Sequence, residues 1–197
     1  MKAAWLVVLA ACSSSSSASH KREYKLSELH LAQFLGGLPL DGGTLTVDLS
    51  QDPDAITDWS KVTGTVTLDC GGCVLGDDHA VLHSNGPFGG DLHFGHISWD
   101  DATTRAVFGG GKIAITGHWR GDVDLDVKAD VMLASRAVVG CLAFRPAERL
   151  LARDEKLHNI FMLTGAPKGD DGRMYIRVAG PLDRLRYMPQ ICEAPAP

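Results

Sequence analysis

Apolar and polar residues alternate along much of this chain. Over residues 44–50, 62–68 and 122–131, nearly every second position is apolar or glycine, and threonine, aspartate or lysine fills most of the positions between. A period of two places the apolar side chains of a segment on one face. Each of these segments is therefore predicted to be a β-strand with one face in the core and the other in water.

Further strands are predicted at 81–83, 91–99 and 105–116, because turn-forming glycine, proline and aspartate residues separate segments of similar pattern. A glycine run, 109–111, lies inside the third of these segments and predicts a bulge or a sharp bend. We expect a mainly β fold, a curved antiparallel meander of about six to eight strands.

A helical segment interrupts this pattern at about residues 146–164. Pro146 suits the first turn of a helix, and Gly165 with Pro167 provides a stop. Between them, four apolar residues recur at near-helical spacing: Leu150, Leu157, Ile160 and Phe161. We predict that these four form a plug that packs on the sheet, and that the last strand, over 174–178, follows it.

Length, charge and motifs limit the functions to consider. The 197 residues, 45% of them hydrophobic, suffice for a single globular domain. The net charge of −5, with no cluster of lysine and arginine, argues against nucleic acid as a partner. No hydrolase, nucleotide-binding or zinc-protease motif occurs, and the aspartate pairs at 77–78, 100–101 and 170–171 lie in predicted turns. We therefore expect a protein that is not an enzyme and has no cofactor.

The amino terminus is similar to an export signal. Residues 3–11 are apolar, and Cys12 ends a segment that resembles the cleavage site of bacterial lipoproteins. The predicted organisation is a signal or lipobox-like segment at 1–12 with lipidation at Cys12, a serine-rich linker at 13–23, one domain at 24–190 and a tail at 191–197. The alternative is that residues 5–11 end a longer membrane helix. In both cases the domain would lie on the periplasmic side of a bacterial membrane, lipid-anchored or tethered to the inner membrane.

Lipidation of Cys12 would leave four of the five cysteines: Cys70, Cys73, Cys141 and Cys192. Four cysteines allow three sets of disulfides in an oxidising compartment. The simplest pairing joins Cys70 to Cys73 across the two glycines between them. Redox catalysis by this pair is a second hypothesis, which the pattern favours less because no helix follows to lower a thiol pKa.

A metal site is a further interpretation of the same region. Cys70, Cys73, His79 and His83 could supply four ligands to a zinc ion. Only five residues separate Cys73 from His79, however, and this spacing is much shorter than that of a zinc finger.

Several segments resemble the type II secretion system protein N (GspN) family. The strand at 122–129 is followed by Phe144-Arg145-Pro146 with its leucine-rich helix, and then by the segments 171–180 and 185–189. The resemblance also includes, less sharply, the glycine-containing segments near residues 40 and 73, and it covers about residues 26–189. It implies a non-catalytic, periplasmic, membrane-tethered accessory component of the machine that moves folded proteins across the outer membrane, with distant kinship to the β-rich, groove-forming envelope proteins of the AsmA type.

The resemblance and the alternating pattern together predict a binding protein. Secretion-system or other envelope proteins are the expected partners, and the sheet would contact them through its edge strands and its apolar concave face. An N-terminal anchor would provide contact with the membrane. The alternative is that the same concave face forms a β-groove that binds or transfers lipid.

Overall fold

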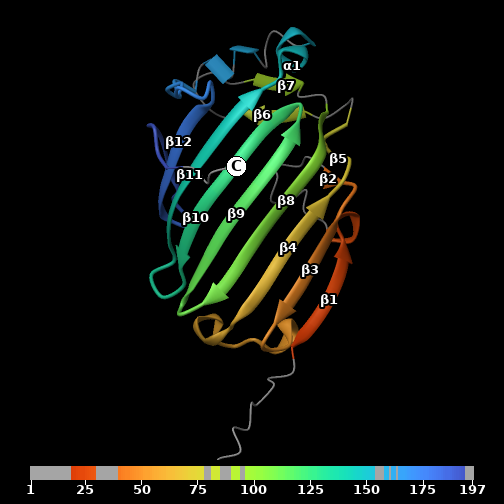
Figure 1. Cartoon of the computed structure of the whole chain (residues 1–197), viewed down its shortest axis with the longest axis vertical. Coiled ribbons are helices and arrows are strands. Elements are labelled where there is room, and N and C mark those ends of the chain that lie inside the picture. Colours follow the sequence, from red (N-terminus) through yellow and green to blue (C-terminus); the bar gives the residue numbers. More distant parts are fainter. Residues whose placement is uncertain are drawn as a thin grey trace, which may run out of the picture.

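The described part of the chain forms one large antiparallel sheet. The computed structural model describes residues 19–29, 40–77, 81–84, 90–93, 96–153, 158–159, 161–162 and 164–193. The fold is mainly β, as expected, but it has more strands than the predicted six to eight. Eleven described strands belong to the main sheet, and β6 and β7 form a separate pair (Figure 1). Among the described residues, no helix has the length and apolar character needed to cross a membrane.

Nine strands lie side by side through the main sheet, in the order β1 (His20–Lys25), β3 (Thr44–Leu49), β4 (Gly64–Cys70), β8 (Ile97–Gly109), β9 (Lys112–Gly121), β10 (Val123–Met132), β11 (Ala137–Pro146), β12 (Met174–Pro181) and β13 (Arg186–Pro189). The sheet is extended at one end by β2 (Leu40–Asp41) and β5 (Cys73–Leu75), and the separate pair is β6 (Val81–Ser84) with β7 (Gly90–His93). Helix α1 spans Glu148–Arg153, and short 3₁₀ helices span Leu26–Glu28, Pro53–Ala55 and Trp59–Lys61.

Neighbours in the sheet are mostly neighbours in the chain. From β8 to β13 each strand pairs with the next one, as in the predicted meander. The sheet is open, because β1 pairs only with β3 and β13 only with β12 among the described strands. On its two long sides the outward backbone groups therefore face no other strand of the described chain.

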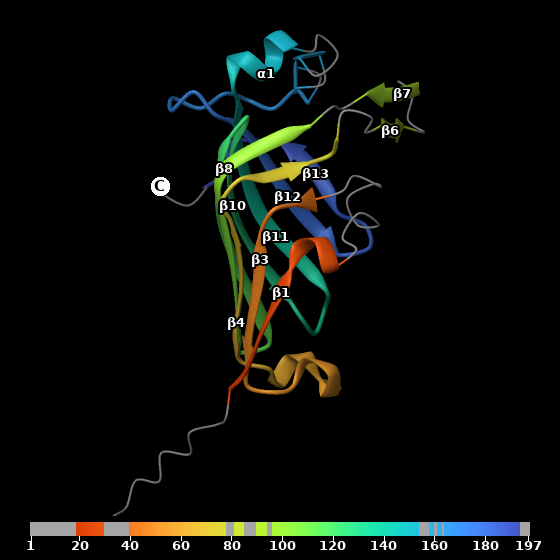
Figure 2. The same cartoon turned by 90° about the vertical axis from the view of Figure 1, so that its right-hand side faces the viewer.

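A line of interruptions crosses the sheet near one end. β4 and β5 pair with the same strand, β8, one after the other: Cys70 lies opposite Ala102, and Cys73 lies opposite Trp99. The two glycines between the cysteines therefore do not reverse the chain. β8 has an irregularity between Trp99 and Asp101, and two glycines separate β2 from β3. Beyond this line β2, β5 and the start of β8 turn over one side of the sheet, which we call the concave face (Figure 2).

Apolar side chains fill the bent end of the concave face. One row of residues opposite one another on adjacent strands consists of Cys70, Ala102, Trp119, Leu125, Phe144 and Met174. The ring of Trp119 meets Trp99 edge to face, with centroids 4.8 Å apart, a favourable geometry for aromatic pairs. Leu26 and Leu150 are buried in the same group, which we call the upper cluster.

A smaller lower cluster closes the other end of the concave face. It contains the buried side chains of Val47, Leu49 and Val62, and Phe108 packs against them. The ring of Trp59 lies 5.9 Å from that of Phe108. The short helices at Pro53–Ala55 and Trp59–Lys61 lie on the concave side at this end (Figure 2).

The expectation of one strand over 105–116 is wrong. β8 ends at Gly109 and β9 begins three residues later, so the chain reverses through Gly110-Gly111. Both glycines have positive φ, 59° and 74°, a conformation that other residues rarely adopt. Conversely, β8 continues through residues 100–101 and β9 through 117–121, where the pattern predicts turns, because pairing with neighbouring strands holds both segments extended.

The boundaries of the helical segment and of the linker also differ from prediction. Pro146 closes β11, and α1 begins two residues later. Two strands, β12 and β13, follow the helix, where the pattern predicts one. β1 begins at His20, inside the region predicted as linker, because it pairs along its whole length with β3.

Candidate functional site

The concave face carries an apolar strip between its two clusters. Ile113, Ile115, Val127 and Leu142 belong to neither cluster, and all four side chains are half-buried. They come from the adjacent strands β9, β10 and β11 and lie on the face that holds Trp119. These four residues, which we call the apolar strip, offer surface on which an apolar ligand or a partner protein could pack.

A pocket of about 360 Å³ lies beyond the lower end of the strip. Its lining includes Val131 of β10, Trp59, which is 45% exposed, and Arg136. The carboxylate of Asp58, also in the lining, is 3.2 Å from Lys61 Nζ, whereas Arg136 makes no ion pair within the described residues. Apolar surface ending beside an unpaired guanidinium is suited to an amphipathic ligand with an anionic group.

Two of the four predicted plug residues, Leu150 and Phe161, lie in the described part of the chain. Leu150 is 1% exposed and belongs to the upper cluster, and Phe161 is half-buried with its ring centroid 6.0 Å from that of Phe144. Leu157 and Ile160 lie outside the described residues, as does Cys12. The described part of the plug therefore covers the bent end of the sheet rather than the apolar strip.

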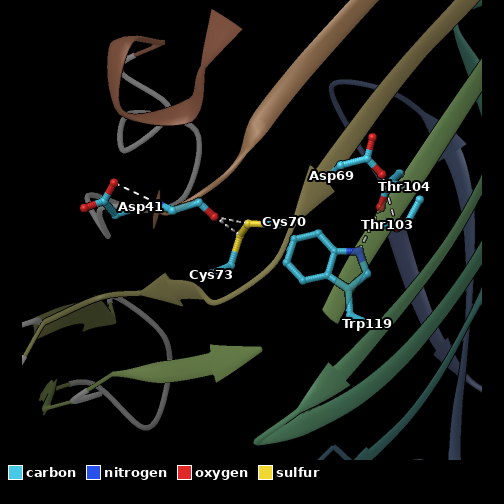
Figure 3. Close-up of a disulfide and its surroundings, with 8 residues drawn as sticks. Asp41, Asp69, Cys70, Cys73, Thr103, Thr104 and Trp119 are labelled. Carbon is cyan, nitrogen blue, oxygen red and sulfur yellow. Dashed lines mark hydrogen bonds between the residues drawn. A yellow bond between two sulfur atoms is a disulfide. The ribbon is translucent and has the colours of Figure 1, made fainter. Parts of the chain in front are cut away.

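Cys70 and Cys73 are bonded to each other, and both are buried at the bend of the sheet. The backbone carbonyl of Gly42 lies against both sulfurs, 2.8 Å from Cys73 Sγ. Figure 3 shows the two bonded cysteines and their surroundings. A cystine has no thiolate to offer a metal. The zinc set with His79 and His83, whose side chains lie outside the described part, would therefore require the reduced protein.

A second disulfide joins Cys141 of β11 to Cys192 in the carboxy-terminal tail. It holds the tail against the side of the sheet opposite the concave face, which we call the polar face (Figure 2). A pocket of about 490 Å³ lies between tail and sheet, and its lining includes Lys128 and Arg177. The sequence left this pairing open among three, because spacing alone does not show which cysteines meet.

We expect the paired substitution of Cys141 and Cys192 by serine to lower the free energy of unfolding by about 2–4 kcal/mol. The disulfide closes a loop of 51 residues, and opening it restores conformational freedom to the unfolded chain. Urea denaturation measures the loss. The same change at Cys70 and Cys73, three residues apart, should cost less by this mechanism, and an equal loss at both pairs would contradict the loop-length explanation.

The polar face contains a buried carboxylate with three cationic or polar neighbours. Asp126 is 0% exposed, and its Oδ1 lies 2.7 Å from both His118 Nδ1 and the Arg120 guanidinium. Arg173 pairs with the other oxygen. The three neighbours come from two parts of the chain: His118 and Arg120 from β9, and Arg173 from the segment before β12. Both carboxylate oxygens therefore have a cationic neighbour, and removal of the carboxylate would leave Arg173 poorly solvated without an opposite charge.

Burial of Asp126 corrects the prediction that one face of β10 lies entirely in water. The alternation of aspartate and apolar residues in this strand identifies the two faces correctly, but it does not show what covers the polar one. Arg173, which closes over Asp126, is 47 positions later in the chain. A charged residue so distant in sequence gives no local signal that a strand carboxylate is buried.

A second buried carboxylate, Asp122, connects the start of β8 to helix α1. Its Oδ2 accepts hydrogen bonds from the backbone N–H and the hydroxyl of Ser98, at 3.0 and 2.8 Å, and its Oδ1 accepts one from Arg149 Nε at 2.9 Å. Burial raises the pKa of Asp122, but these hydrogen bonds and the charge of Arg149 outweigh it, so the pKa lies below its ordinary value.

The Asp122→Asn variant is expected to lose stability at neutral pH and to lose little in acid. Because the folded-state pKa is depressed, the carboxylate stabilises the fold fully above the unfolded-state value of about 4 and ceases to do so as pH falls through the folded-state pKa. Urea denaturation from pH 7 to pH 2 measures the difference between variant and parent. In a Ser98→Ala background the difference should shrink, and a difference independent of pH would contradict this account.

Comparison with models of known protein families, with curated proteins and with solved structures finds no match to this chain. The candidate site is therefore defined by geometry alone: the apolar strip, the pocket with Trp59 and Arg136, and the free edges of the sheet.

Proposed function

We propose that this protein is a non-catalytic accessory or scaffold component of the type II protein secretion system, positioned on the periplasmic side of a bacterial membrane. The observation that carries the proposal is the apolar strip, an incompletely covered surface at the centre of a curved sheet. Apolar surface of this kind is typical of a docking site for another protein. The resemblance of segments between residues 26 and 189 to GspN proteins supports the assignment to secretion.

The disulfides are consistent with a location outside the cytoplasm. Two cystines, one buried and one securing the tail, would persist only in an oxidising compartment. The export-like amino terminus and Cys12 support the same location.

Cross-linking in the native envelope tests this function. The tethered protein is cross-linked mildly, purified, and its partners are identified by mass spectrometry. Secretion-channel or inner-membrane platform proteins are expected in the parent sample and should be reduced in a Val127→Asp variant, which places a charge in the apolar strip. The matched control is Lys128→Asp, which places the same side chain at the next position of β10, on the polar face. If no secretion component is recovered with the parent protein, the assignment to secretion is wrong.

A second candidate function is binding or transfer of lipid along the concave face. The observation that favours it is the pocket beside Trp59, where apolar surface ends near Arg136, an arginine with no ion-pair partner in the part of the chain that the structure describes. An acyl chain could lie on the strip while an anionic headgroup pairs with the guanidinium.

Lipid extraction separates the two candidates. A carrier purified from membranes should retain phospholipid in stoichiometric amount, and Arg136→Ala should reduce that amount several-fold. Arg184→Ala, a change at an arginine whose side chain is 86% exposed beside β12, is the control. Absence of lipid from the purified parent protein would remove the carrier hypothesis and leave the scaffold proposal untouched.

A further inference from the structure

β1 is an edge strand whose outward hydrogen-bonding groups can be assigned. Leu26 lies opposite Gly43 in the continuation of the β1–β3 register, and its N–H donates to the Gly43 carbonyl at 3.0 Å. In an antiparallel pair, residues that exchange hydrogen bonds with the partner alternate with residues whose groups point away. The even-numbered residues of β1 therefore bond to β3. The N–H and C=O groups of Lys21, Glu23 and Lys25 point outward, and no described strand pairs with them.

The other edge is less suited to pairing. β13 has four residues and ends at Pro189, which has no N–H to donate, whereas β1 has six residues and no proline. Of these two edge strands, β1 is the one able to accept another strand over several residues.

A second copy of β1 fits this edge in one register only. Antiparallel pairing must place outward-facing residues opposite one another, and two such registers keep five residues of each strand in contact. One sets Lys21 opposite Lys25 and Glu23 opposite itself, which places like charges together. The other sets Lys21 of each copy opposite Glu23 of its partner, and pairs of opposite charge across strands are stabilising.

The centre of the second register is Arg22, which would lie opposite Arg22 of the other copy. Each guanidinium is already held within its own chain, 2.6 Å from Asp52 and 2.6 Å from Asp54. Two arginines would therefore meet accompanied by four carboxylates, so that like-charge repulsion between the guanidinium groups is offset.

We propose that the protein forms a two-fold symmetric dimer through antiparallel β1–β1 pairing centred on Arg22. The axis runs perpendicular to the sheet, so the two sheets join edge to edge and both concave faces lie on the same side. This inference goes beyond the proposed function and does not depend on it. Because only short strands meet, the dimer should be weak and dependent on protein concentration.

Sedimentation equilibrium of the full chain over a range of concentrations tests the dimer. The parent protein is expected to approach twice its monomer mass at high concentration. Lys21→Glu places a glutamate at position 21 of each copy opposite Glu23 of the other copy. This repulsion should raise the dissociation constant about tenfold or more. Adding Glu23→Lys to that variant swaps the two charges and should restore association. A monomeric parent at all concentrations, or a charge swap that stays monomeric, would overturn the proposal.

Disulfide trapping tests the register. In the proposed pair the Cα atoms of the two Arg22 residues lie about 4.5 Å apart, within the range that a disulfide spans. Arg22→Cys should therefore form a covalent dimer on mild oxidation, above the background of the parent chain. Lys21→Cys should not, because its counterpart is displaced by two residues, about 7 Å along the strand. Equal trapping of both variants would show that the strands do not pair in this way.

Discussion

Replacing Asp126 by alanine is expected to lower the free energy of unfolding by about 3–5 kcal/mol, because it removes the carboxylate that His118, Arg120 and Arg173 share. Asp126 is 0% exposed, and the side chain of Arg173 that pairs with it is only 15% exposed. Without the carboxylate, Arg173 would remain in a poorly solvated position with no opposite charge, and desolvated charges are costly when unpaired. Urea denaturation at pH 7, followed by circular dichroism, measures the loss.

The matched control is Asp124→Ala, two residues earlier on the same face of β10. Asp124 pairs with Arg145 at 2.8 Å, but the arginine side chain is 53% exposed, so water replaces much of the interaction when the pair is broken. The control should lose less than about 1 kcal/mol. If the two variants lost the same amount, the cluster around Asp126 would contribute no more than a surface ion pair.

Replacing Leu150 by alanine is expected to cost about 2–5 kcal/mol, towards the upper end of that range. Leu150 is 1% exposed and is the residue by which α1 enters the upper cluster, so truncation leaves a cavity lined by the sheet. Leu151, the next residue of the same helix, is half-buried, and its replacement by alanine provides a control with the same change in composition and helix propensity. Urea denaturation of both variants gives the comparison.

The difference between the two leucine variants is the informative quantity. A loss at Leu150 below about 1 kcal/mol would show that α1 is not part of the core, because full burial of a leucine is worth more than that. A large loss at Leu150 with a small one at Leu151 would establish that the helix is fixed by one side chain against the upper cluster.

The two-residue periodicity predicted the fold class and the individual strands at 44–50 and 122–131. The expected curvature was inferred from the glycine run at 109–111, which forms the turn between β8 and β9 rather than a bend within one strand. The pattern did not predict the path of the chain through two pairs of glycines. Gly110-Gly111 reverses the chain between β8 and β9, whereas the two glycines between Cys70 and Cys73 leave their strand in line with β8. Both pairs look alike in the sequence, because glycine permits either path, and the pairing of the flanking segments decides between them.

The apolar strip could be anticipated only in part. Val127 has the alternation of a core residue, and the sequence places it on the apolar face of its strand. No strand was predicted around Leu142, which lies in β11. That they are left half-buried follows from where the upper and lower clusters end, which depends on segments packed from elsewhere in the chain. The pocket beside Trp59 combines residues 57–60 with residues 131–136 and has no sequence signature.

The amino-acid pattern alone shows which residues share a face of the sheet, because alternation along an extended chain is a local property of the backbone. The sequence also predicts correctly that the domain is mainly β, and its acidic balance without basic clusters predicts that nucleic acid is not a partner. Cys70–Cys73 was expected as the simplest pairing, but only the folded chain shows that Cys141 meets Cys192, which aspartates on the polar face are buried, and which described strands lie at the edges of the sheet. Each of these depends on contacts between segments many residues apart, and the free energy of such contacts is not encoded in any one segment.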